Sequence, residues 1–195
     1  MEKNRLEAFS DGVLAIIITI MILELKQPLG DSFSDFWELA PTLLAYFVSF
    51  FFIAIYWVNH HHLFHSAETI NVKILWCNIG WLFVMSFIPF ATAWVGTYVS
   101  SWAPLTLYFA DMVLACITFH LMSFFIAREK GEKFRLGLRS ILSLVIYTLA
   151  ALLGGFCPIA AFIAVALISA SWIIPEKKKK DIRPPQDILN DEVNK

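Results

Sequence analysis

The sequence predicts an all-α membrane protein with six transmembrane helices. Of its 195 residues, 58% are hydrophobic and only 16% are charged, whereas an ordinary soluble domain is about 25% charged. The chain also contains six apolar segments, and a membrane-spanning helix needs about 20 mostly apolar residues. Most lysines and arginines fall outside these segments. An excess of apolar residues arranged in this way is typical of an integral membrane protein.

The first three helices are expected at residues 5–26, 38–64 and 72–98. The first ends before Pro28, and the second carries a histidine-rich end. The third contains Pro89, which removes a backbone donor and clashes with the preceding turn. We therefore expect a kink in the third helix.

The last three helices are expected at residues 104–127, 136–154 and 158–174. Pro104 stands in the first turn of its helix, where proline is tolerated. Gly154 and Gly155 separate the last two segments by so few residues that they must form an antiparallel hairpin. We expect the six helices to form one transmembrane domain over residues 1–175, and residues 176–195 to form a charged cytoplasmic tail.

The basic residues predict the orientation of the chain. In a six-helix arrangement Lys26 alone falls on one side of the membrane, and the other 14 Lys and Arg residues fall on the opposite side. The positive-inside rule places both termini in the cytoplasm, so we expect a multi-pass protein of the cell membrane. Residues 31–35, between the first two helices, are expected to form an acidic external loop.

Several function classes are disfavoured by the sequence. A formal net charge of −1 does not suit a nucleic-acid-binding protein, which needs a basic face. Cys77, Cys116 and Cys157 lie in apolar runs and form no CxxC pair, which disfavours a thiolate metal site. No motif of a hydrolase, zinc protease or phosphate-binding loop is present. We therefore expect that the protein is not an enzyme and that it needs no cofactor.

The first helix has an unusual pattern. Gly12, Ile16, Thr19 and Leu23 recur at spacings of four, three and four, which places them on one helix face. Such a stripe is compatible either with plain packing or with the lining of a pore. Its uninterrupted apolar part, residues 12–23, is only roughly 18 Å long, too short to cross lipid unaided. This favours a position towards the centre of an assembly, with Asp11 as a candidate ion ligand or helix tie.

The second helix ends in the run Asn59-His60-His61-His62-Leu63-Phe64-His65. His61 and His65 are four residues apart and share a helix face, which is a workable spacing for metal ligands. The alternatives are a structural hydrogen-bond network or proton sensing. If the histidines bind a transported ion, the chain is a secondary transporter or metal-ion exporter.

The opening residues Arg5-Leu6-Glu7-Ala8-Phe9-Ser10-Asp11, read as RxxxFSD at the start of a first membrane helix, resemble the signature of the transmembrane protein 175 family of potassium channels. The six-helix pattern and the Trp-and-His segment from Trp57 to His65 resemble a prokaryotic single-repeat member.

The resemblance implies a homotetramer in the lipid bilayer, with the first helix of each subunit lining a pore for monovalent cations. It places a hydrophobic constriction at Ile16, with Thr19 and Leu23 beyond it and Gly12 as a further lining position. This constriction stands in place of a carbonyl selectivity filter, so the implied function is a potassium-permeable channel with modest selectivity for potassium over sodium. The resemblance further implies a polar network that holds the helices in register, formed by Arg5, Phe9, Ser10 and Asp11 with partners in the second and third helices. The candidate partners in the second helix are Trp57, His60 and His61, and the sequence does not decide which of the two adjacent histidines takes part.

Overall fold

The computed structural model describes residues 2–173, and the regular secondary structure of these residues is entirely helical. The predicted tail at residues 176–195 lies outside the described residues. The helices, in chain order, are α1 (Lys3–Leu23), α2 (Phe33–Trp37), α3 (Ala40–His65), α4 (Val72–Met85), α5 (Ile88–Thr97), α6 (Trp102–Glu129), α7 (Leu138–Leu153) and α8 (Pro158–Ala170), followed by a 3-10 turn (Ser171–Ile173).

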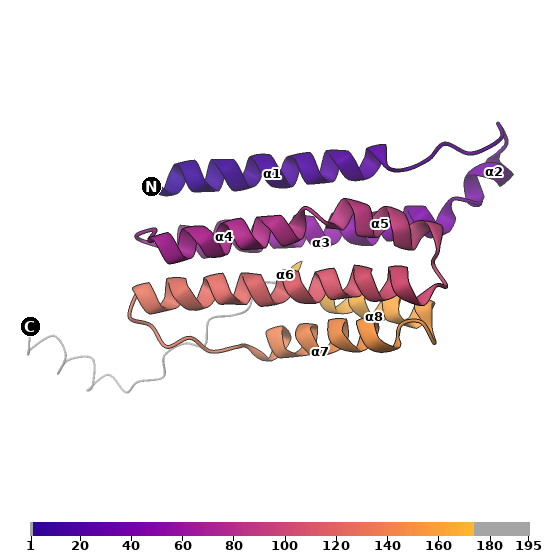
Figure 1. Cartoon of the computed structure of the whole chain (residues 1–195). Coiled ribbons are helices and arrows are strands. Elements are labelled where there is room, and N and C mark those ends of the chain that lie inside the picture. The colour runs from indigo at the N-terminus through magenta and orange to yellow at the C-terminus, as the bar shows by residue number, and fades with distance from the viewer. Residues whose placement is uncertain (1, 174–195) are drawn as a thin grey trace, which may run out of the picture.

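The long helices form a bundle in which α1 lies along one edge (Figure 1). α1 packs against α3, α4 and α5, whereas α6 packs against α4, α5 and α7. The α7–α8 hairpin lies on the side of the bundle opposite α1. Because α1 is covered on one side only, a large part of its surface is left open.

Within residues 2–173, four helical stretches are long and apolar enough to cross a membrane: α1, α3, the combined α4–α5 stretch and α6. α7 and α8 are apolar but shorter. Each of the six ranges expected from the sequence overlaps one of these helices, and the ends differ by a few residues. The first helix, for example, ends at Leu23 instead of residue 26. The number of membrane crossings stays a prediction.

The third expected helix is interrupted, as the proline indicated. α4 ends at Met85 and α5 begins at Ile88, with Pro89 in the first turn of α5. The two residues between the helices keep single-turn hydrogen bonds: the Ser86 amide donates to Leu82 and Phe83, and the Phe87 amide to Val84. The expected kink is therefore confirmed as a break between two short helices.

The segment expected as an acidic external loop contains a short helix, α2, so the expectation of an irregular loop was wrong, whereas its external location stays a prediction. Ser32 and Asp35 form a capping box at the start of α2: the Ser32 hydroxyl accepts from the Asp35 amide, and the Asp35 carboxylate accepts from the Ser32 amide. This reciprocal bonding satisfies two amides that a helix start otherwise leaves open. The S-x-x-D spacing was the sequence signal for this short helix.

α3 and α5 approach each other closely at Gly96. The Thr42 hydroxyl on α3 donates to the Gly96 carbonyl at 3.0 Å. A Cβ atom at position 96 would lie only 2.8 Å from the Thr42 Cα, so a side chain there would push the helices apart. A second, buried contact joins α3 to α5 and α6: the Ser49 hydroxyl forms hydrogen bonds with the Thr92 hydroxyl at 2.7 Å and the Tyr108 hydroxyl at 2.9 Å.

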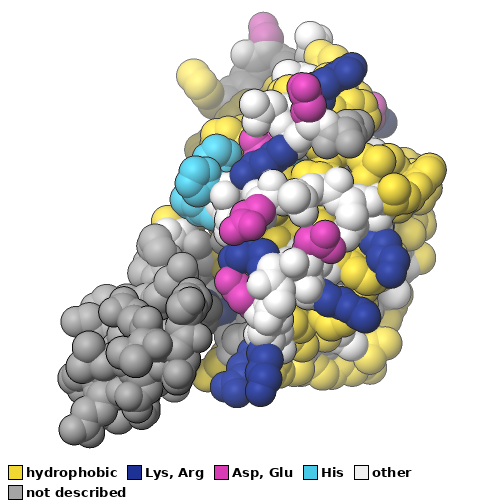
Figure 2. Space-filling model, turned by 90° about the vertical axis from the view of Figure 1, so that its left-hand side faces the viewer, with side chains coloured by type: hydrophobic (Ala, Val, Ile, Leu, Met, Phe, Trp, Pro, Cys, Tyr) yellow, Lys and Arg dark blue, Asp and Glu magenta, His cyan; other side chains and the backbone are white. Residues whose placement is uncertain are grey.

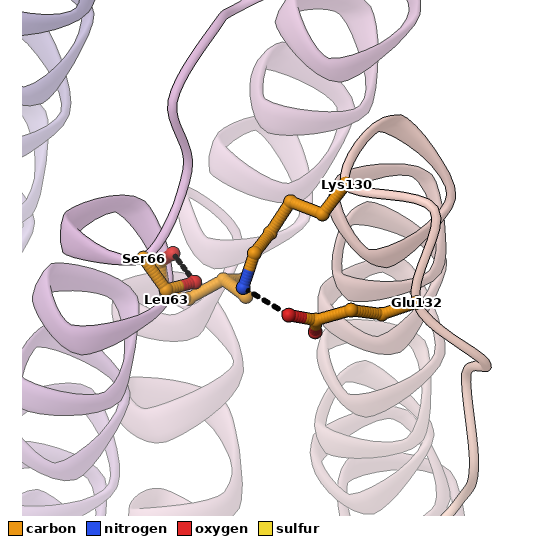
Figure 3. Close-up of polar contacts among 4 residues, drawn as sticks. All are labelled: Leu63, Ser66, Lys130 and Glu132. Carbon is orange, nitrogen blue, oxygen red and sulfur yellow. Dashed lines mark hydrogen bonds and ion pairs between the residues drawn. The ribbon is translucent and has the colours of Figure 1, made fainter. Parts of the chain in front are cut away.

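Charged side chains gather at the end of the bundle where α1 begins and α3 and α6 end (Figure 2). At this end the Asn71 amide donates to Glu129 at 2.6 Å. Lys130 pairs with Glu132 at 2.7 Å, beside the last turn of α3, where Ser66 donates to the Leu63 carbonyl at 2.8 Å (Figure 3). Hydrophobic side chains border this charged end on the right-hand side of the view.

Candidate functional site

α1 has two distinct faces. Its buried face consists of Leu6, Ser10, Leu14, Ile17 and Met21, which follow each other at spacings of three or four residues and pack on α3, α4 and α5. Gly12, Ile16, Thr19 and Leu23 are all exposed on the other side.

The exposed stripe is mostly apolar. Ile16 is 58% exposed and Leu23 is 80% exposed, although both are large hydrophobic side chains. Thr19 supplies the hydroxyl between them and donates its proton to the Ile16 carbonyl at 2.8 Å. Since the proton is held by this bond within the helix, the lone pairs of the Thr19 oxygen are free to accept a hydrogen bond or to contact a cation.

A groove runs beside this stripe, between α1 and the start of α5. Its volume is about 410 Å³. It is lined by Val13, Ile16, Ile17, Ile20, Glu24, Ser86, Pro89 and Phe90. Ile16 therefore belongs both to the exposed stripe and to the wall of an open groove.

On its buried face α1 is held by a chain of hydrogen bonds across three helices. The Ser10 hydroxyl donates to the Leu6 carbonyl at 2.9 Å and accepts from the Asn78 amide of α4 at 2.9 Å. The Asn78 carbonyl oxygen lies 2.8 Å from His60 Nε2 of α3, so that ring nitrogen carries the donated proton. Ser10, Asn78 and His60 are fully or almost fully buried.

The His60 ring is fixed from both sides by aromatic rings. It stacks on Trp81 with ring centroids 4.9 Å apart and planes 11° apart, and on Phe64 with centroids 4.5 Å apart. Stacking and the hydrogen bond to Asn78 together leave His60 one orientation. Of the two adjacent histidines that the sequence could not distinguish, the structure brings His60 into the network.

Asp11 forms a second tie between α1 and α3. Its carboxylate accepts a hydrogen bond from Trp57 Nε1 at 2.8 Å. Both residues are exposed, in contrast to the buried Ser10–Asn78–His60 network. Arg5 and Phe9 are exposed as well, and within residues 2–173 neither forms a hydrogen bond or ion pair with that network.

The remaining histidines lie apart from the network. His61, His62 and His65 are exposed on the last turns of α3. Residues 2–173 contain no group of three or more His, Cys, Asp and Glu side chains arranged to hold a metal ion. A preassembled metal centre with three or more such ligands is therefore missing from this part of the chain.

Sequence reasoning missed Asn78, the central residue of the network. The residue was visible as the one amide in the apolar run that forms α4, and buried amides in membrane helices commonly bond neighbouring helices. The candidates taken from the sequence were ionisable side chains, and asparagine is not ionisable.

A bundle of long apolar helices, joined by a buried polar network between α1, α3 and α4, defines a multi-pass membrane protein. The family model described as the endosomal/lysosomal potassium channel TMEM175 matches residues 5–89. A relative from Chryseobacterium sp. (strain P1-3), named a potassium channel, is 40% identical over 184 residues, which cover 91% of this chain and 96% of the relative. The chain belongs to the TMEM175 family, and the resemblance seen in the sequence is confirmed.

Two further comparisons agree with this assignment. The crystal structure of a lysosomal potassium-selective channel TMEM175 homolog from Chamaesiphon minutus matches with a TM-score of 0.79 at 26% identity, covering 88% of this chain and 96% of that chain. A Gallus gallus relative, named an endosomal/lysosomal proton channel, is 40% identical over 76 residues, which cover 33% of this chain and 15% of the relative. Family and relatives are channels, not enzymes.

Proposed function

We propose that this protein is a potassium-permeable cation channel in which the exposed face of α1 lines the ion path. The observation that carries the proposal is the exposure of Ile16, Thr19 and Leu23 on one face of α1, whose opposite face packs on α3, α4 and α5. The apolar part of α1 was expected to be too short to cross lipid, but the whole helix is long enough, so its length does not support the proposal. The names of the bacterial relatives support potassium as the permeant ion.

Four copies arranged around a common axis would place the α1 stripes opposite one another. Rings of Ile16 and Leu23 would then form narrow apolar necks, which an ion crosses only when water enters. Between them a ring of Thr19 hydroxyl oxygens would offer cations polar contacts, because each hydroxyl proton is held by the Ile16 carbonyl. One hydroxyl per subunit is a weaker filter than a cage of carbonyls, so we expect modest selectivity for potassium over sodium.

In this arrangement the polar network holds the pore helix in position. It attaches the buried side of α1, close to where the exposed stripe begins, through hydrogen bonds among Ser10, Asn78 and His60. Asp11 accepts a hydrogen bond from Trp57, so we assign it the role of a tie between α1 and α3, not that of an ion ligand. The groove between α1 and α5 is the place where a neighbouring subunit would pack.

The distribution of charge supports a cytoplasmic location for the end of the bundle where α1 begins. Lys73, Arg128 and Lys133 are exposed at this end, and Lys26 follows α1 at the other. Under the positive-inside rule both termini face the cytoplasm of a cell-membrane protein. Lipids and monovalent cations are the partners of such a channel, and its mechanism needs no cofactor.

Flux into liposomes tests the proposed ion path. We expect Ile16→Asn to raise potassium flux several-fold, because a polar ring keeps the neck wet, and Leu23→Ala to change the flux and lower selectivity. Ile117→Asn is the matched control, since Ile117 is 46% exposed on α6 and should leave flux unchanged. If Ile16→Asn and Leu23→Ala both conduct like the wild type, the pore assignment is wrong.

The same liposomes separate other permeation modes. A pH-sensitive dye reports proton flux, which the name of the Gallus gallus relative makes a second candidate. Single-channel recordings distinguish a channel from the secondary transporter or metal-ion exporter considered from the sequence, because carriers turn over orders of magnitude more slowly. Proton flux without potassium flux would overturn the assignment of the permeant ion.

A further inference from the structure

One row of side chains on α3 is left unexplained by the proposed ion path. Trp57, His61 and His65 follow each other at intervals of four residues, so they lie along one edge of the helix. Trp57 is bonded to Asp11, but the two histidines beyond it are exposed. Figure 2 shows histidine side chains gathered on this end of the molecule.

The rings of His61 and His65 lie face to face. Their centroids are 6.3 Å apart, and their planes differ by 22°. The His62 ring is tilted by 59° against His61, at a centroid distance of 6.0 Å. Within the described residues none of these three rings donates or accepts a hydrogen bond. They therefore serve no network of the kind that holds His60.

Two histidines four residues apart on a helix form a known chelating pair, since their imidazole nitrogens can reach one ion on the same face. Zinc binds imidazole nitrogen at about 2.0–2.1 Å, which needs the two nitrogens about 3.3 Å apart in a tetrahedral site. Exposed side chains change rotamers freely, so the two near-parallel rings can converge without movement of the helix backbone.

We propose that His61 and His65 form a binding site for a divalent transition-metal ion at the end of α3. Imidazole ligands suit zinc, nickel and copper, whereas magnesium and calcium prefer oxygen. With two protein ligands and no third within residues 2–173, water completes the coordination. The site is thus an open one, which a metal enters and leaves.

The site lies where α3 contacts the beginning of α1. The Lys3 ammonium donates to the His65 carbonyl at 3.3 Å and to the Ala67 carbonyl at 3.0 Å. At the other end of the row Trp57 bonds Asp11. A metal bound to His61 and His65 therefore sits between two contacts that attach α1 to α3.

Calorimetric titration of the purified full-length protein, carrying no histidine tag, with nickel or zinc chloride tests the proposal without any measurement of conduction. We expect one ion per subunit in the wild type. His61→Ala and His65→Ala should each weaken binding roughly tenfold or more, because each leaves a single imidazole. Magnesium chloride should produce no saturable heat at this site.

His62→Ala is the matched control, because His62 is also exposed and undergoes the same exchange. We expect its metal affinity to stay within about twofold of the wild type. Equal losses of metal affinity in all three variants would show that all three histidines contribute alike, which would overturn the proposal of a His61–His65 pair. Unchanged binding in His61→Ala and His65→Ala would overturn it as well. Because only binding is measured, a failure of the proposed ion path would leave this result intact.

Discussion

Replacing Asn78 with leucine tests the network that holds α1. The exchange removes two hydrogen bonds between helices, one to His60 at 2.8 Å and one from Asn78 to Ser10 at 2.9 Å. It leaves the buried His60 nitrogen without its partner, whereas Ser10 keeps its bond to the Leu6 carbonyl. Most of the expected loss in the free energy of unfolding therefore comes from the unpaired His60 nitrogen.

The magnitude follows from the number of bonds lost. Hydrogen bonds between membrane helices contribute about 0.6 kcal/mol on average and at most about 1.7 kcal/mol, so two bonds amount to about 1–3 kcal/mol. In a chain of this length each kcal/mol shifts the melting temperature by about 2–4 °C. We expect Asn78→Leu to lower the apparent Tm by roughly 2–12 °C.

Thermal unfolding in detergent, followed by fluorescence-detected size exclusion, measures this shift. Asn59→Leu is the matched control, because among residues 2–173 the Asn59 amide bonds only the Ile55 carbonyl one turn earlier in the same helix, at 2.8 Å. An apparent Tm of Asn78→Leu no lower than that of Asn59→Leu would refute the reasoning that the network attaches α1 to its neighbours.

Three further outcomes are expected. Gly96→Ala should destabilise the protein by about 1–3 kcal/mol through overpacking, whereas Gly80→Ala, whose added Cβ meets nothing within 4 Å, should be neutral or slightly stabilising in the same unfolding assay. Trp57→Phe removes the indole donor to the α1 carboxylate and should cost about 0.5–1.5 kcal/mol; full stability would show that this exposed bond contributes nothing. Hydrogen bonds from the Ser32 side chain, and next from its backbone, lower the pKa of Asp35 below its usual 3.8. The α2 cap is therefore complete at neutral pH and is lost as the pH falls below about 3.8, which hydrogen exchange of residues 32–37 would detect as protection that declines only in acid.

The helices were predictable because the apolar runs are long and their ends are marked by proline, glycine or charge. The break before Pro89 followed from the chemistry of proline. The spacing of Gly12, Ile16, Thr19 and Leu23 predicted that they share one face of α1, and all four are exposed. The motif at the start of α1 also singled out Ser10, Asp11 and Trp57, which the structure places in bonds between helices.

What the sequence left open depends on contacts between distant parts of the chain. Asn78 meets Ser10 across 68 positions, and no local pattern specifies that pairing. His60 and His61 are neighbours in sequence, but successive residues on a helix point about 100° apart, so only the packed structure assigns one to the interior. Arg5 and Phe9 belong to the motif, yet they are exposed, and their function stays a prediction.

The shortness of the α7–α8 hairpin affects how the protein fits its membrane. α7 has 16 residues and α8 has 13, which correspond to roughly 24 and 20 Å, whereas the hydrocarbon layer is about 30 Å thick. α1, with 21 residues, extends roughly 31 Å along the opposite edge. If α7 and α8 cross the membrane as the sequence predicts, the two edges of the bundle match bilayers of different thickness, and each ångström of mismatch costs a fraction of a kcal/mol. We then expect bilayers of short-chain lipids to fit the α7–α8 edge better and bilayers of long-chain lipids to fit the α1 edge better.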